Sequence, residues 1–181
     1  MERPPWLLPG LLVEAGADPC KPGDARGNTA LMGVAFRGHD AIASQLDTYK
    51  RELDLIGKPF PEEFPVRREV FVAPTRKEAY HLAKEPIMTK YRAYHSWGLG
   101  QARVSAGEED ELGQPFEELL QDRFFIGSPD DVAEQIIKFN KRIGMNHIVM
   151  SMHWPGLEVS RSMETMQLLA EEVFPRVRQG L

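Results

Sequence analysis

The sequence contains a single cysteine, Cys20, among its 181 residues. One cysteine cannot form an intramolecular disulfide, so a reducing compartment is the simplest interpretation. No apolar run approaches the ~20 residues needed to cross a membrane. The first six residues, MERPPW, also lack the basic start and the long apolar stretch of a signal peptide. We therefore expect a soluble, cytoplasmic protein with no membrane partner.

The chain also lacks an excess of basic residues. Its 22 lysines and arginines are outnumbered by 27 aspartates and glutamates, which gives a net charge of -5. Without a broad basic surface, a dedicated nucleic-acid binder is disfavoured. The hydrophobic share of 42% and the charged share of 27% are those of an ordinary globular protein. The length fits one domain, or one domain with a small attachment.

Several familiar site motifs are absent as well. No set of His, Cys, Asp and Glu residues has metal-ligand spacing, so we expect no metal site. No nucleophile and base occur in a recognised catalytic context. Gly98-Leu99-Gly100 is not a dinucleotide fingerprint, because Arg103 stands where the third glycine would be and no strand precedes it.

Residues 11–42 predict short helices separated by turns. Gly16 ends an apolar helix, Thr29 caps a second one, and Gly38 ends that helix before a further short helix that carries Ile42. The segment resembles about one ankyrin repeat, from LLVEAGADP to GNTALMGVAFRGHDAI, although Ala30 stands for the usual proline and Met32 for the usual histidine. About three stacked repeats are needed for stability. The segment is therefore interpreted either as a protein-binding surface or as a remnant of a fusion.

From residue 46 onward the pattern changes to strands and helices in alternation. A helix is expected from Asp47 to Gly57, and a β-branched strand over residues 66–73. Thr75 and Glu78 form a capping box for a helix that Pro86 should break, with a second helical stretch from Ile87 to Trp97. The acidic stretch over residues 98–114 is expected to be a solvated loop.

The clearest unit is a strand–helix–strand over residues 123–152. A short apolar strand, RFFI, ends at Gly127, and Ser128-Pro129-Asp130-Asp131 begins a helix. An apolar stripe of Val132, Ile136, Phe139 and Ile143 runs to a stop at Gly144, and a strand over residues 146–152 and a last helix over about 163–178 follow. Such alternation predicts a parallel sheet with both faces covered by helices.

Side-chain alternation divides the last strand into two faces. Ile148, Met150 and Met152 share one face and are expected to meet helices. The opposite face, which would be the interior of a barrel, carries His147, Val149, Ser151 and His153. The segment His153-Trp154-Pro155-Gly156 would then follow the carboxyl end of the strand, where barrel enzymes assemble their sites.

Four segments occur in order along the second part of the chain: REVFVA with Thr75 and Glu78-Ala79, GSPDDVA at 127–133, HWPG at 153–156, and the closing Met166 with EVFP at 172–175. This ordered series resembles the luciferase-like flavin monooxygenases. It covers about residues 46–181 and matches the C-terminal part of the family. The resemblance implies a (β/α)8 barrel that uses FMN or the deazaflavin F420 to oxidise a small organic molecule. It thus predicts an α/β fold, the last few βα units of a TIM barrel, because a whole barrel needs about 250 residues.

Three residues are candidates for the site. His153 could donate a hydrogen bond to a flavin or substrate or act as a general acid, or it is a rim histidine bonded to backbone. Trp154 could wall a flavin or substrate pocket, or simply pack. Ser128 could hold a phosphate at a helix N-terminus, or serve as a plain cap. An aromatic helix end with Tyr91, Tyr94, His95 and Trp97 either packs or lines substrate, and His147 is expected to be structural.

The sequence therefore predicts two parts, an ankyrin-like fragment over residues 1–44 and a luciferase-like barrel portion over residues 45–181. The leading hypothesis is a flavin-dependent oxidoreductase, truncated or fused, with weak or no activity. The alternative is a non-enzymatic interaction module that binds a protein through the ankyrin-like segment. A homo-oligomer built through open sheet edges is also considered.

Overall fold

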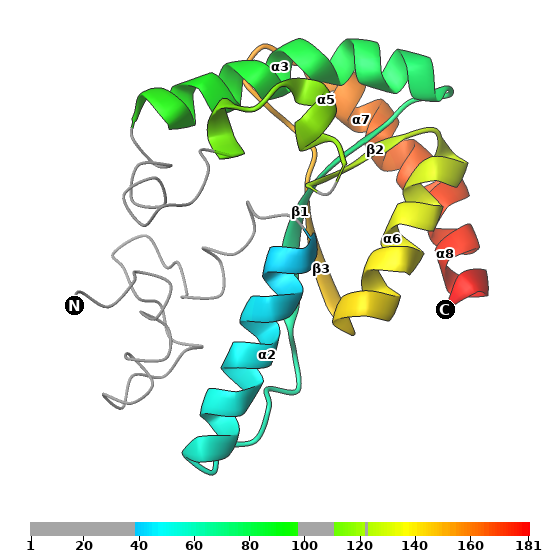
Figure 1. Cartoon of the computed structure of the whole chain (residues 1–181). Helices are drawn as coiled ribbons and strands as arrows, with labels where there is room; N and C mark the ends of the chain where they lie inside the picture. Colours follow the sequence, from blue (N-terminus) through cyan, green and yellow to red (C-terminus); the bar gives the residue numbers. More distant parts are fainter. Residues whose placement is uncertain (1–38, 98–110, 122) are drawn as a thin grey trace.

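The structure is a computed structural model that describes residues 39–97, 111–121 and 123–181 (Figure 1). The predicted ankyrin-like helices before residue 39 lie outside this range. The described part is an α/β fold whose three strands are all parallel. Parallel βαβ architecture, as expected from the sequence, is confirmed.

The sheet has the order β2-β1-β3. Strand β1 (Pro65–Val72) pairs through its carboxyl half with β2 (Phe124–Gly127), so that Val72 lies opposite Gly127. Its amino half pairs with β3 (His147–Ser151), with Glu69 opposite Ser151. Successive strands of a (β/α)8 barrel are neighbours, whereas here β3 lies beside β1 and not β2. The partial barrel is therefore not confirmed by the described strands.

Helices cover the sheet on two faces. Helix α3 (Arg76–Ser96) connects β1 to β2, and α6 (Pro129–Ile143) leads from β2 back across the sheet to β3. Right-handed crossovers that run in opposite directions place their helices on opposite faces. The core agrees, because Val70 and Val72 pack in the cluster of α6 while Phe71 and Ala73 pack in the cluster of α3. The result is a three-layer arrangement, helix on sheet on helix.

Helix α2 (His39–Leu55) differs from the sequence prediction. Two separate helices were expected here, one carrying Ile42 and one starting at Asp47, and that prediction is wrong. Ile42, Leu46, Tyr49 and Leu53 are all buried at spacings of four, three and four, so one apolar stripe runs through the segment and packs on the α6 side of the sheet. The helix passes through Ser44, and the division of the chain at that residue stays a prediction.

Helix α3 continues through Pro86, which was expected to break it. Proline removes one intrahelical hydrogen bond and crowds the preceding turn. Here the stripe of Ala79, Ala83, Ile87 and Tyr91 is buried on both sides of the proline, and its packing against the sheet keeps the helix continuous. The proline-break prediction is therefore wrong.

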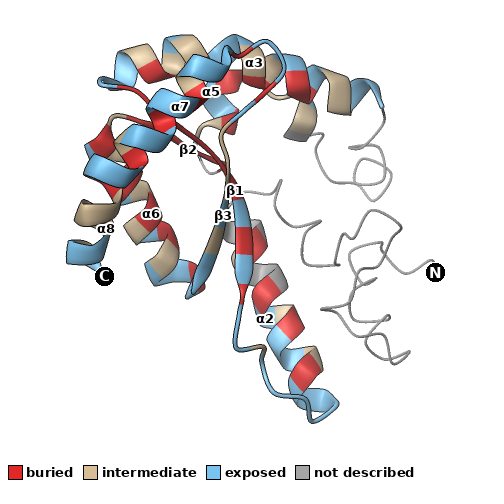
Figure 2. Cartoon of the chain, turned by 180° about the vertical axis from the view of Figure 1, so that it is seen from behind, coloured by how far each residue is buried: buried red, intermediate tan, exposed pale blue. Residues whose placement is uncertain are grey.

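The remaining helices complete both layers. A 3-10 turn η3 (Glu111–Gly113) and α5 (Phe116–Leu119) lie beside α3. The end of the chain forms α7 (Val159–Leu168), a π-helical turn η4 (Leu169–Val173) and α8 (Phe174–Gly180), one continuous run that begins four residues before the predicted start. Figure 2 shows the buried residues gathered between these helices and the sheet. None of the helices in the described ranges is long and apolar enough to cross a membrane.

Candidate functional site around the carboxyl ends of the strands

Parallel α/β sheets bind ligands beyond the carboxyl ends of their strands, where neighbouring strands send their helices to opposite faces. Between β1 and β3 this position is filled by α7. The Thr165 hydroxyl accepts a hydrogen bond from the Val72 amide at 3.3 Å and donates to the Val72 carbonyl at 3.1 Å. Thr165 is fully buried. The crevice between these two strands is therefore closed by packed helix.

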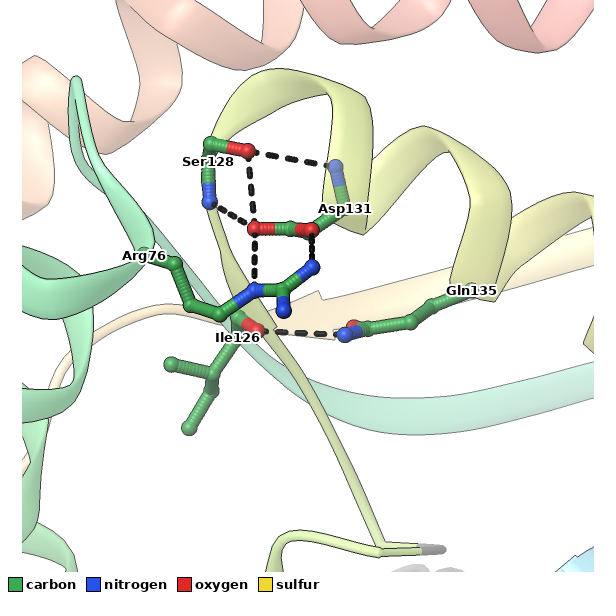
Figure 3. A network of polar contacts seen from close by, with 5 residues as sticks. All are labelled: Arg76, Ile126, Ser128, Asp131 and Gln135. Atoms are coloured by element: carbon green, nitrogen blue, oxygen red, sulfur yellow. Dashed lines mark hydrogen bonds and ion pairs between the residues drawn. The ribbon is translucent and has the colours of Figure 1, made fainter.

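Ser128 lies after β2 and begins α6 (Figure 3). Its hydroxyl accepts from the Asp131 amide at 3.3 Å and donates to Asp131 Oδ2 at 2.8 Å, while its own amide donates to the same oxygen at 3.0 Å. Arg76, the first residue of α3, holds both carboxylate oxygens of Asp131, with Nε at 3.0 Å from Oδ2. A carboxylate of the protein thus occupies the N-terminus of α6.

The physical consequences for Asp131 follow from these contacts. The bond from Arg76, together with those from Ser128, holds the pKa of the carboxyl well below its usual range, although burial opposes the shift. The residue before Ser128 must be glycine for this arrangement, because a Cβ on Gly127 would lie 2.5 Å from Asp131 Cβ. Ser128 is therefore a helix cap in a reciprocal capping box.

His153 follows the carboxyl end of β3 and is exposed. Its Nδ1 lies 3.1 Å from the Ser162 hydroxyl of α7, which itself donates to the Met152 carbonyl at 2.9 Å. Ser162 is buried. One nitrogen of the imidazole thus contacts α7, while His153 as a whole is exposed.

Trp154, the next residue, points into the core on the α3 side of the sheet. It is 1% exposed, and its ring centroid lies 5.9 Å from that of Phe71. The indole Nε1 is buried without a hydrogen-bond partner among the described residues. Trp154 therefore packs against β1, and Ser128, His153 and Trp154 contact different parts of the fold.

The amino half of the sheet has one open face. Val149 of β3 is 43% exposed, and His147 of the same face is also exposed. Ser151 accepts a hydrogen bond from Arg67 of β1 at 3.2 Å across this surface. The opposite face carries Ile148, Met150 and Met152 against the α6 cluster, which confirms the predicted alternation. The face that would be a barrel interior is thus open to solvent in the described part of the chain.

A groove of 600 Å³ lies over α3, α5 and the start of α6. Two of its cations are engaged in ion pairs, Arg76 with Asp131 and Lys84 with Glu117 at 2.5 Å. Gln135 donates to the Ile126 carbonyl at 3.1 Å (Figure 3), and its side-chain oxygen is buried without a donor among the described residues. The groove is lined by Arg76, Tyr80, His81, Lys84, Phe116, Glu117, Leu120, Gln121 and Gln135.

A buried ion pair between β1 and α3 was missed by the sequence reasoning. Glu69 and Lys90 form it, with exposed side-chain fractions of 7% and 9%. Part of the signal was present, because Glu69 is an acidic residue within a predicted strand and Lys90 falls on the buried side of α3. Nearby, burial raises the pKa of Tyr91, whose ring meets Phe124 edge to face at 5.5 Å.

The aromatic end of α3 thus divides into a packed and an exposed part. Tyr91 is buried in the core, whereas Trp97 is 68% exposed and contacts Tyr94 at a centroid distance of 5.7 Å.

In the described ranges, no group of three or more His, Cys, Asp or Glu side chains is placed to hold a metal ion.

The chain is similar in sequence to known monooxygenases. No family model matches the chain. It is 29% identical over 155 residues to 2,5-diketocamphane 1,2-monooxygenase 1 of Pseudomonas putida, and 29% identical over 153 residues to monooxygenase 2 of the same organism. These matches cover 80% and 79% of this chain but 43% and 42% of the relatives. The chain therefore spans less than half the length of the curated relatives it matches.

Solved structures agree on the fold. The oxygenating constituent of 3,6-diketocamphane monooxygenase from Pseudomonas putida, a type II Baeyer–Villiger monooxygenase in complex with FMN, superposes with a TM-score of 0.59 at 24% identity. The superposition covers 83% of this chain and 46% of that one. A riboflavin lyase solved with modified FMN and riboflavin gives a TM-score of 0.52 at 14% identity, over 79% of this chain and 37% of that one. Over the aligned parts the chain shares the fold of these proteins, and its homologues, at distant identity, are diketocamphane monooxygenases.

Proposed function

We propose that this chain contributes to a flavin-dependent oxidoreductase of the luciferase-like kind, in which FMN oxidises a small organic substrate. The observation that carries the proposal is the sequence match to two monooxygenases over four-fifths of the chain. The fold shared with an FMN-bound oxygenating protein supports the same cofactor. The flavin supplies the redox chemistry when bound, and the protein supplies position and polarity.

The described residues fit the flavin ring better than its phosphate. The open face offers one exposed apolar side chain, Val149, between His147 and Ser151, and Arg67 bonds Ser151 across the same surface. His153 lies just beyond the carboxyl end of the same strand and is exposed. We assign the ring to this face, with His153 as the polar group at its edge.

The N-terminus of α6 does not fit the phosphate. Free amide groups at a helix start attract anions, but the Asp131 carboxylate already accepts from Ser128 there and is paired with Arg76. A phosphate would have to displace that carboxylate against its own negative charge. Ser128 is therefore left out of the cofactor contacts, and the phosphate is assigned to residues beyond this helix terminus.

The proposal is tested by titrating FMN with the purified chain and measuring binding through the quenching of flavin fluorescence. Saturable binding is expected, and Val149→Glu should weaken it at least about tenfold because it places a charge under an apolar ring. His81→Gln on α3 is the matched control and should leave FMN affinity unchanged. Ser128→Ala should lower stability and spare affinity. The absence of saturable quenching in the folded wild-type chain would refute the assignment of FMN.

A further inference from the structure

We propose that Ser162 holds neutral His153 in the Nδ1–H tautomer, so that Nε2 presents a lone pair to a ligand at the carboxyl end of β3. His153 then accepts a hydrogen bond from an N–H or O–H group of that ligand. The nature of the ligand rests on the proposed function, whereas the tautomer follows from contacts within the chain.

The argument begins with the single proton of the Ser162 hydroxyl. The Met152 carbonyl lies 2.9 Å from Ser162 Oγ and has no hydrogen to give, so the hydroxyl donates to it. The same oxygen lies 3.1 Å from His153 Nδ1. With its proton engaged, Ser162 can only accept from the ring. Nδ1 therefore carries the hydrogen.

Ser162 is buried, which fixes its contacts with Met152 and His153, whereas His153 itself is exposed. Ser162 is 6% exposed and lies on α7, so water cannot readily replace either of its partners. Met152 and His153 are consecutive, and one hydroxyl therefore anchors both the backbone at the strand end and the ring that follows it. His153 as a whole is exposed, so a ligand can reach its ring from solvent.

The tautomer determines which ligand groups His153 can meet. A neutral ring with hydrogen on Nδ1 has an acceptor at Nε2. A ligand hydroxyl or amine N–H pairs with it, whereas a ligand carbonyl oxygen is repelled until the ring takes up a second proton. His153 thus acts as a hydrogen-bond acceptor or base in its neutral form and donates through Nε2 only as the imidazolium. Ser162 is a positioning residue for this role.

Long-range ¹H–¹⁵N correlation spectra of the full chain, recorded where imidazoles are neutral, report the tautomer directly. His153→Gln identifies the signals by their loss. The wild type should show Nδ1 protonated and Nε2 unprotonated. An ordinary net hydrogen bond corresponds to about a fivefold bias between tautomers. Ser162→Ala should therefore return His153 toward the Nε2–H form by about that factor, and Ser162→Thr, which keeps the hydroxyl, should retain the Nδ1–H form.

Ser160→Ala on the same helix is the matched control, because Ser160 is exposed and contacts Glu158 at 3.5 Å. It should leave the His153 signals unchanged. The proposal would be overturned if the wild-type His153 ring carried its proton on Nε2. It would also be overturned if the folded Ser162→Ala variant had the same His153 tautomer as the wild type. The spectra contain no flavin, so a failure of FMN binding leaves the tautomer result standing, and the two proposals fail separately.

Discussion

Removing the Asp131 carboxylate should destabilise the protein through the start of α6. The side chain is 11% exposed and accepts from both the amide and the hydroxyl of Ser128. Hydrogen bonds to a charged group contribute about 1.5–3 kcal/mol. We expect Asp131→Ala to lower the free energy of unfolding by about 2 kcal/mol. Arg76 is 64% exposed, so solvent screens its share of the loss.

Asp130→Ala is the matched control for this change. Asp130 is the neighbouring aspartate in the same first turn, but its side chain is 84% exposed, and its partner is Arg176 at 2.8 Å on the surface. Exposed ion pairs contribute about 0–1 kcal/mol. Urea unfolding of both variants, followed by circular dichroism, measures the difference. Equal losses in the two variants would refute the capping argument.

The pH dependence supplies a second check on the same residue. The pKa of Asp131 is lowered by folding, so its contribution to stability is fully present above the ordinary aspartate pKa of about 4. It is lost as the pH falls from there toward the lower pKa of the folded state. The gap between the wild type and Asp131→Ala should therefore be largest near neutral pH and shrink in acid. A gap that stays constant across this range would contradict the assigned charge.

Two further predictions concern buried polar contacts. Lys90→Met should cost about 3–5 kcal/mol in urea unfolding because it leaves the Glu69 carboxylate buried without its cation, and adding Glu69→Leu should recover part of that loss. A double variant no more stable than Lys90→Met would argue against the pair. Thr165→Val should cost about 1–3 kcal/mol by removing the hydroxyl that bonds the amide and carbonyl of Val72, whereas Thr165→Ser should cost less. Thermal unfolding that ranks these two variants the other way would contradict that role.

Local elements were predictable where a short stretch of sequence contains the whole signal. In α6, Ser128 and Gly144 mark the ends and the apolar stripe between them marks the buried face, and the structure confirms both. Capping and helix periodicity involve residues only a few positions apart. The same locality explains why Ile148 and Met150 were correctly placed toward the helices.

Local rules failed where packing over a longer range decided the outcome. Pro86 breaks isolated helices, yet burial of α3 along its length outweighs the lost hydrogen bond. The helix start predicted at Asp47 was wrong for another reason, because the apolar spacing that identified the helix extends back through Leu46 to Ile42. In α3 the tertiary environment supplied the larger energy.

The candidate site was predictable in part. The sequence identified Ser128, His153 and Trp154 as residues that follow strands, and the structure places all three there. It could not show that Asp131 fills the helix start beside Ser128, or that Trp154 turns into the core. Such outcomes depend on partners that the strand pattern does not specify.

The sequence by itself determined the alternation of strand and helix, the buried faces of those elements and the resemblance to flavin monooxygenases. These properties reside in neighbouring residues or in an ordered series of motifs. Only the tertiary structure decided the strand order β2-β1-β3, the closure of the crevice by Thr165 and the orientation of His153 by Ser162. Each depends on groups brought together from separate elements, whose pairing is chosen by the packing of the whole fold rather than by local propensity.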